Sequence, residues 1–245
     1  MNEIDLGIFD HILLFLLGIV LPVLAVFQSQ VEMKTMKFDT VMKKQVYYGN
    51  GVFQWICVGL ILLTWWGNNR LFADLGFQVG TWTPTAWLLM AIFLALYLFD
   101  VWWELRNSTK ILETKTKWLK EIPILPTTFE EFKHFLFVAF SAGVCEEIIF
   151  RGFFIQYFLA VNENNELGNW LAIIIPACMF AFGHLYQGEK AVMKILLMAI
   201  LFGWIFLLTN SLLLLIFIHF LVDVLGGYLA YSLLKNEIRE EMPDL

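Results

Sequence analysis

The amino-acid sequence predicts an all-α protein, a polytopic transmembrane helical bundle of about seven spans, with six to eight also compatible. Two observations carry this prediction. Of the 245 residues, 60% are hydrophobic and only 16% are charged, whereas a soluble domain has about 45–50% apolar and about 25% charged residues. The apolar residues also gather in runs of roughly 20, the length that crosses a bilayer as a helix.

Seven runs are long and apolar enough to be spans. They are approximately residues 8–28, 48–66, 82–103, 132–160, 168–186, 190–208 and 211–234. The run 132–160 is longer than a straight span requires, so it can tilt, extend beyond the bilayer or consist of two helices. A short or re-entrant element within this run is also compatible with the sequence.

Basic residues in the short loops predict the orientation, because cytoplasmic loops carry an excess of Lys and Arg. The loops after the first and third runs and the C-terminal tail are basic, through Lys34, Lys37, Lys43, Lys44, Arg106, Lys110, Lys115, Lys117, Lys120, Lys235 and Arg239. The opposite loops are poor in basic residues. With seven spans, the N-terminus faces out and the C-terminus lies in the cytoplasm.

Other features narrow the class of protein. A net charge of −6 offers no basic surface for nucleic acid. The cysteines, Cys57, Cys145 and Cys178, lie inside apolar runs without a CxxC pattern, which supports neither a disulfide framework nor a zinc knuckle. The acidic N-terminus and the lack of a clear cleavage site predict that the first run stays as a membrane anchor.

The loop 104–131 is the only candidate for a boundary between two parts of the chain. Before it lie three runs with few polar residues, and after it lie four runs with nearly all the candidate chemistry. We therefore treat residues 1–131 as peripheral N-terminal spans and loops, and residues 132–245 as the core that carries the candidate chemistry.

Two adjacent carboxylates, Glu146 and Glu147, lie within the fourth run. An ionisable residue at the centre of a membrane helix costs at least about 2.5–3.5 kcal/mol on insertion scales, so such residues are usually functional. Glu147 shares a helix face with Arg151 in the favourable order, whereas Glu146 lies about 100° around the helix. We expect Arg151 to hold Glu147 charged and Glu146 to act as a base in a cavity. The alternative is a structural Glu–Arg pair with a second Glu at the headgroup boundary.

Later runs add further polar groups. His184 lies one helical turn after Phe180, and the alternative for it is an interfacial histidine. His219 and Asp223 share one face of an otherwise apolar run. A carboxylate that orients a histidine occurs in both metal sites and base catalysis; the alternative here is a self-contained pair that fixes helix packing.

Convergence on one cavity is the simplest way for these side chains to avoid lipid. A cavity with a base, a water and either a metal or an oxyanion site has the parts needed to hydrolyse a peptide bond. Its lining would be Glu146, His184, His219 and Asp223.

Together, three motifs resemble, in order, those of the CPBP family of CAAX-processing endoproteases and bacteriocin-processing or immunity proteins, also called the Abi family. They are Glu146-Glu147-x-x-x-Arg151, Phe180-x-x-x-His184 and His219-x-x-x-Asp223, and the likeness covers roughly residues 132–234. The resemblance implies an all-helical bundle with an intramembrane site. It implies that Glu146 and His184 activate the attacking water and that Glu147 with Arg151 supports the motif helix. His219 and the residue at 223 would stabilise the oxyanion or bind metal.

Asp223 departs from the family pattern, because CAAX-processing members usually carry Asn at this position. An ionised carboxylate cannot donate a hydrogen bond to an oxyanion, so Asp223 must be protonated, orient His219 or ligate a metal. Two histidines with carboxylates suit zinc with an open position, which makes zinc a candidate cofactor. An Asp at this position looks more like the bacterial branch of the family. The resemblance therefore favours a bacterial cell membrane as the location of the protein.

Three functions remain. The leading hypothesis is an intramembrane endopeptidase, with or without a metal, that cleaves a membrane-associated peptide or protein. The second is a non-proteolytic membrane scaffold or bacteriocin-immunity protein of the same fold. The third is a proton-coupled transporter, which the lack of repeated halves disfavours.

Overall fold

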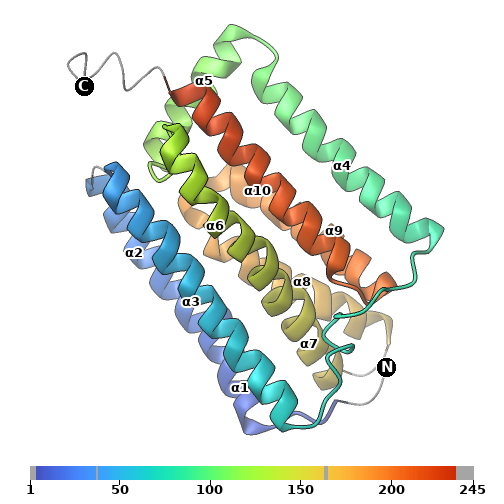
Figure 1. The fold of residues 1–245 in the computed structure, drawn as a ribbon. Helices are drawn as coiled ribbons and strands as arrows, with labels where there is room; N and C mark the ends of the chain where they lie inside the picture. The colour runs from blue at the N-terminus through green and yellow to red at the C-terminus, as the bar shows by residue number, and fades with distance from the viewer. Residues whose placement is uncertain (1–3, 37, 163–164, 236–245) are drawn as a thin grey trace.

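The described residues of the computed structural model, 4–36, 38–162 and 165–235, form helices and connecting loops without a β-strand. The long helices lie side by side in one bundle (Figure 1). Among these residues, six helical segments are long and apolar enough to cross a membrane: Ile8–Gln28, Thr40–Gly67, Pro84–Leu105, Glu166–Gly183, Glu189–Thr209 and Leu213–Leu234. The predicted all-α polytopic bundle is therefore confirmed, and the protein is an integral membrane protein.

The first half of the chain supplies three of these segments. The first is α1 (Ile8–Phe15), a π-helical stretch η1 (Leu16–Val20) and α2 (Leu21–Thr35), which follow one another without a break. α3 (Thr40–Gly67) begins where the Asp39 carboxylate accepts a hydrogen bond from the Met42 amide at 2.8 Å, and α4 (Pro84–Leu105) begins after Thr83, which caps it in the same way. α5 (Ser108–Glu121), a polar helix, then leads into the second half.

The predicted run 132–160 is one continuous helical segment rather than two helices. It consists of α6 (Phe129–Glu146), the π-helical stretch η2 (Glu147–Phe154) and α7 (Ile155–Val161). Its composition keeps it out of the six apolar segments, because charged residues stand both at its start and at its middle. π-helical turns inside α-helices are frequent at functional sites, and here η2 begins at Glu147 of the first motif.

The remaining helices surround this segment. α8 (Glu166–Gly183) is followed by the short 3-10 turn η3 (Leu185–Gln187), α9 (Glu189–Thr209) and α10 (Leu213–Leu234). α6 packs between α3 and α10 (Figure 1). A glycine allows the second of these contacts, since a Cβ on Gly143 would lie 2.9 Å from the Phe220 backbone nitrogen of α10. Small residues permit this close approach in membrane bundles.

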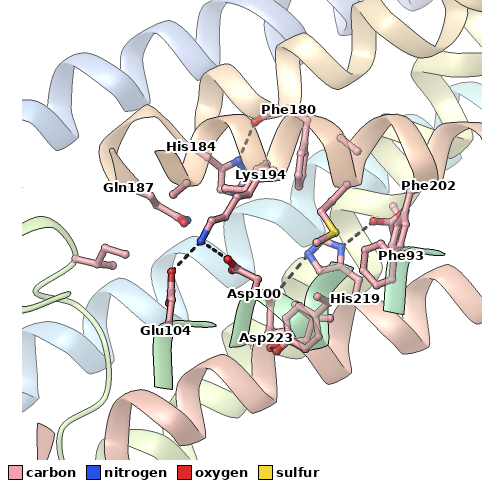
Figure 2. Close-up of a pocket in the computed structure, with 18 of the residues that line it drawn as sticks. Phe93, Asp100, Glu104, Phe180, His184, Gln187, Lys194, Phe202, His219 and Asp223 are labelled. Carbon is pink, nitrogen blue, oxygen red and sulfur yellow. Dashed lines mark hydrogen bonds and ion pairs between the residues drawn. The ribbon is translucent and has the colours of Figure 1, made fainter. Parts of the chain in front are cut away.

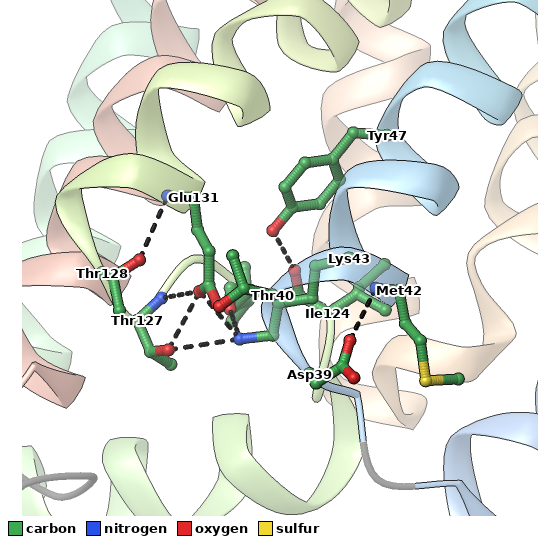
Figure 3. Close-up of polar contacts among 10 residues, drawn as sticks. Asp39, Thr40, Met42, Lys43, Tyr47, Ile124, Thr127, Thr128 and Glu131 are labelled. Carbon is green, nitrogen blue, oxygen red and sulfur yellow. Dashed lines mark hydrogen bonds and ion pairs between the residues drawn. The ribbon is translucent and has the colours of Figure 1, made fainter. Parts of the chain in front are cut away.

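A buried polar network joins the start of α3 to the start of α6 (Figure 3). The Lys43 ammonium, with its side chain 4% exposed, donates to the Glu131 carboxylate at 3.0 Å and to the Leu125 carbonyl at 2.9 Å. Glu131 also accepts hydrogen bonds from Thr40 and Thr127. Because every charge here has a partner, the network fixes the two helix ends without leaving an unpaired buried ion.

The orientation in the membrane stays a prediction. Of the basic residues that predict it, Lys37 and Arg239 lie outside the described residues, and the Lys34 side chain is likewise not described.

Candidate active site

Glu147, the second of the two adjacent carboxylates in the first motif, is the buried centre of the polar cluster. Its side chain is fully buried, and its Oε1 accepts a hydrogen bond from Arg151 Nη1 at 2.8 Å. The same oxygen lies 2.7 Å from Nδ1 of His219 on α10. Glu147 thus joins the first motif to the third, and its pairing with Arg151 has the geometry that the sequence predicts.

Arg151 is packed as well as paired. Its Cζ lies 4.8 Å from the centre of the Phe180 ring and 5.3 Å from that of Phe202. Both distances suit a cation–π contact. The first residue of the second motif, Phe180, therefore helps to hold the arginine of the first.

His219 presents its second nitrogen to two further carboxylates. Its Nε2 lies 3.8 Å from Oε2 of Glu146 and 3.8 Å from Oδ2 of Asp223. These distances are too long for hydrogen bonds, and the contacts are ion pairs only when the histidine is protonated. A histidine held at Nδ1 by one carboxylate and facing others at Nε2 is oriented for proton chemistry.

His184 ends α8 and is held by its own helix. Its Nδ1 lies 2.7 Å from the Phe180 carbonyl oxygen, one turn earlier. The carbonyl can only accept, so Nδ1 carries the proton and Nε2 of the neutral ring is an acceptor. The ring stacks near Tyr186, with centroids 6.2 Å apart.

Glu146 lies on the α3 side of the cluster. Its Oε1 accepts a hydrogen bond from Gln54 Nε2 of α3 at 3.0 Å, and its side chain is 16% exposed. The sequence interpretation missed this partner. The signal available was an amide side chain inside the otherwise largely apolar run 48–66.

A cavity of about 320 Å³ lies beside the cluster (Figure 2). Glu147, Arg151, His184, His219 and Asp223 line it, whereas Glu146 is not among its lining residues. The remaining walls are mainly apolar and come from α4, α9, α10 and the C-terminal end of α5 with the residue after it, including Phe93, Tyr97, Ile122, Ile195, Met198, Phe202 and Val222. Such a space accommodates an apolar chain next to a small polar centre.

Charged residues of α4 and α9 meet at one part of this cavity. The Lys194 ammonium lies 2.5 Å from Oδ1 of Asp100 and 2.8 Å from Oε1 of Glu104 (Figure 2). These three residues line the cavity. The ion pairs join the two helices there.

The predicted zinc site is not assembled by the side chains as they stand. Among the described residues, no group of three or more His, Cys, Asp or Glu side chains is placed to hold a metal ion. Zinc therefore stays a prediction, and no chemical step below depends on it.

The six predicted site residues thus form one connected cluster. Glu147, Arg151, His219 and Asp223 are joined by the contacts above, Glu146 faces His219, and Phe180 connects Arg151 to His184. The roles assigned to the individual residues stay predictions.

Comparison with known proteins agrees with this cluster. No curated protein and no solved structure matches the chain significantly. The family model described as type II CAAX prenyl endopeptidase Rce1-like matches residues 128–225, a segment that contains all three motifs. Across these residues the chain is therefore similar to Rce1-like CAAX-type proteases, a similarity that confirms the resemblance indicated by its motifs.

Proposed function

We propose that the protein is an intramembrane endopeptidase in which Glu146 and His184 activate a water for attack on a peptide bond. The arrangement around His219 is the observation that carries the proposal. This histidine is bonded to the buried Glu147 at 2.7 Å and faces Glu146 and Asp223 at 3.8 Å each. A structural pair that only fixed helix packing would not need three carboxylates around one imidazole.

The reaction follows from these groups. The Glu146 carboxylate takes a proton from the water, while Nε2 of His184 accepts the water's other hydrogen bond. The water oxygen bonds to the scissile carbonyl carbon, and the carbonyl π electrons move to the oxygen. In its protonated form, His219 donates from Nδ1 to Glu147 and from Nε2 to that oxyanion. Collapse of the intermediate then breaks the C–N bond, and the leaving nitrogen takes the proton from Glu146.

Glu147 and Asp223 support this chemistry without touching the scissile bond. Glu147 orients His219, as a carboxylate orients the histidine of a catalytic triad. The Asp223 carboxylate stabilises the charge on His219 from 3.8 Å. In this arrangement Asp223 does not need to be protonated. An ionised Asp is therefore compatible with the proposed reaction, although CAAX-processing members usually carry Asn at this position.

The substrate we propose is a membrane-associated peptide or protein with an apolar or lipid-modified segment. The largely apolar cavity walls support it, and a type II CAAX prenyl endopeptidase is the protein class whose model matches. The cellular setting we infer from Asp223 and the family resemblance is a bacterial cell membrane, and the basic loops favour a C-terminus in the cytoplasm.

The experiment is a comparison of membrane-protein peptides from cells that express the wild-type protein, Glu146→Ala or His184→Ala at equal levels. We expect one or more proteins to be shortened only in the wild-type cells. If the peptide profiles were equal and both variants kept the cellular phenotype of the wild-type protein, the non-proteolytic scaffold would be favoured instead.

A further inference from the structure

We propose that Gln54 is a positioning residue for Glu146, so that α3 completes the active site. This inference rests on the proposed function, because it concerns how the base of that reaction is oriented. Gln54 lies outside the segment 128–225 that matches the family model.

A hydrogen bond joins Gln54 of α3 to Glu146 of α6. Gln54 Nε2 donates to Glu146 Oε1 at 3.0 Å. An ionised carboxylate can only accept, so the amide nitrogen must face it. A hydrogen bond to a charged group is stronger than one between neutral groups.

The hydrogen bond from Gln54 also orients the Glu146 carboxylate. With Oε1 held by α3, Oε2 is the oxygen that lies 3.8 Å from Nε2 of His219. One oxygen of Glu146 is thus occupied and the other is directed toward the reacting groups. Fixing a catalytic group in its productive geometry is a large part of catalytic efficiency.

α3 is also held close enough to α6 for this contact to be maintained. A Cβ on Gly51 would lie 2.5 Å from the Phe137 ring and 2.9 Å from Ser141 Oγ, so the glycine lets these side chains pack closely against α3. The neighbouring Trp55 Nε1 donates to Ser141 Oγ at 3.1 Å. The two helices are therefore joined on both sides of Gln54, at Gly51 and at Trp55, by contacts that do not involve Gln54.

The second polar atom of the Gln54 amide indicates a role in positioning rather than in packing. The Gln54 Oε1 atom is buried and has no hydrogen-bond partner among the described residues. An unsatisfied buried acceptor destabilises a fold. A side chain selected only to pack α3 on α6 would be apolar, so the amide is better explained by its bond to Glu146.

The test compares Gln54→Met, which keeps the length of the side chain but removes the donor, with Trp55→Phe as the control that removes another hydrogen bond between the same helices. The probe is an internally quenched farnesylated CAAX peptide, cleaved by the purified full chain in proteoliposomes. We expect Gln54→Met to lower kcat by about ten- to a hundredfold with KM unchanged. Trp55→Phe should keep both constants, because the close packing at Gly51 still holds α3 against α6. Equal kcat in Gln54→Met and wild type would overturn the proposal.

Thermal unfolding provides a readout that does not depend on activity. We expect Gln54→Met to lower the Tm of the wild-type protein but not that of Glu146→Ala, where the amide has already lost its partner. An equal shift in both backgrounds would show that Gln54 acts through packing alone. If Glu146→Ala itself cleaved the probe at the wild-type rate, the proposed function would fail, and the two failures are therefore distinguishable.

Discussion

Oε1 of Glu147 accepts from Arg151 at 2.8 Å and lies 2.7 Å from Nδ1 of His219, so one buried oxygen joins two motifs that lie 72 residues apart. Each motif therefore relies on the other for one contact of this carboxylate. His219 depends on Glu147 for its orientation, and Arg151 depends on the same carboxylate for its charge balance.

Glu147→Ala should destabilise the protein more than Glu146→Ala. The first variant leaves the Arg151 guanidinium buried without its carboxylate, and breaking a buried pair from one side typically costs about 3–5 kcal/mol. The second removes a carboxylate that is partly exposed and bonded to a neutral amide. Thermal unfolding of both variants in the same detergent measures the difference. Equal Tm values would contradict the central structural place of Glu147.

Gly143→Ala should separate α10 from α6 and reduce activity. The new methyl group would lie 2.9–3.0 Å from the Phe220 backbone and Cβ atoms, so α10 must shift and carry His219 with it. Gly226→Ala on α10 is the matched control, since a Cβ there meets nothing within 4 Å. We expect at least about a tenfold loss of activity in Gly143→Ala, because a displacement near 1 Å can cost more than this. Similar activity in the two alanine variants would exclude a role for this close approach.

The network between α3 and α6 should make stability depend on pH in the acid range. Burial raises the pKa of the Glu131 carboxyl, but the Thr127 amide hydrogen bond and the Lys43 charge outweigh it and hold this pKa below its usual value. Glu131 stands just before the predicted span 132–160. A lowered pKa stabilises the folded state above the unfolded value of about 4.3, and this stability is lost as the pH falls through the folded value.

Measured as Tm against pH, the loss should therefore begin below about pH 5. The double variant Lys43→Met/Glu131→Leu removes both charges and should show a weaker dependence over the same range. A dependence as steep as that of the wild type would mean that other carboxylates dominate the acid response.

Asp223→Asn separates the roles open to Asp223. We expect this variant to keep its metal content, measured by elemental analysis of the purified protein, and activity within about tenfold of the wild type. The reason is that an Asn amide can donate directly to the oxyanion. A loss of zinc together with activity would show instead that Asp223 is a ligand.

The sequence predicts the fold because membrane spans have a strong compositional signal. The run 48–66 marks α3, although the helix begins at Thr40, since Lys43 and its neighbours are polar and an apolar run cannot include them. α5 was missed for the same reason, as its 14 residues are largely polar. The π-helical form of η2 has no signal in hydropathy.

Helical spacing also predicts the pairing of Glu147 with Arg151, which is local. It does not predict the bond from Glu147 to His219, nor that from Gln54 to Glu146, because both depend on how distant helices pack. Spacing also gives no sign that Lys194 meets Asp100 and Glu104 at the cavity.

The most direct test of the account is cleavage of the internally quenched farnesylated CAAX peptide by purified wild-type protein and by Glu146→Gln. Glu130→Gln, which changes an exposed glutamate of the same helix, is the control. We predict cleavage by the wild type and by Glu130→Gln, and a loss of about 10²–10⁴-fold in Glu146→Gln, the usual contribution of a general base. Cleavage by Glu146→Gln at the wild-type rate would contradict the account.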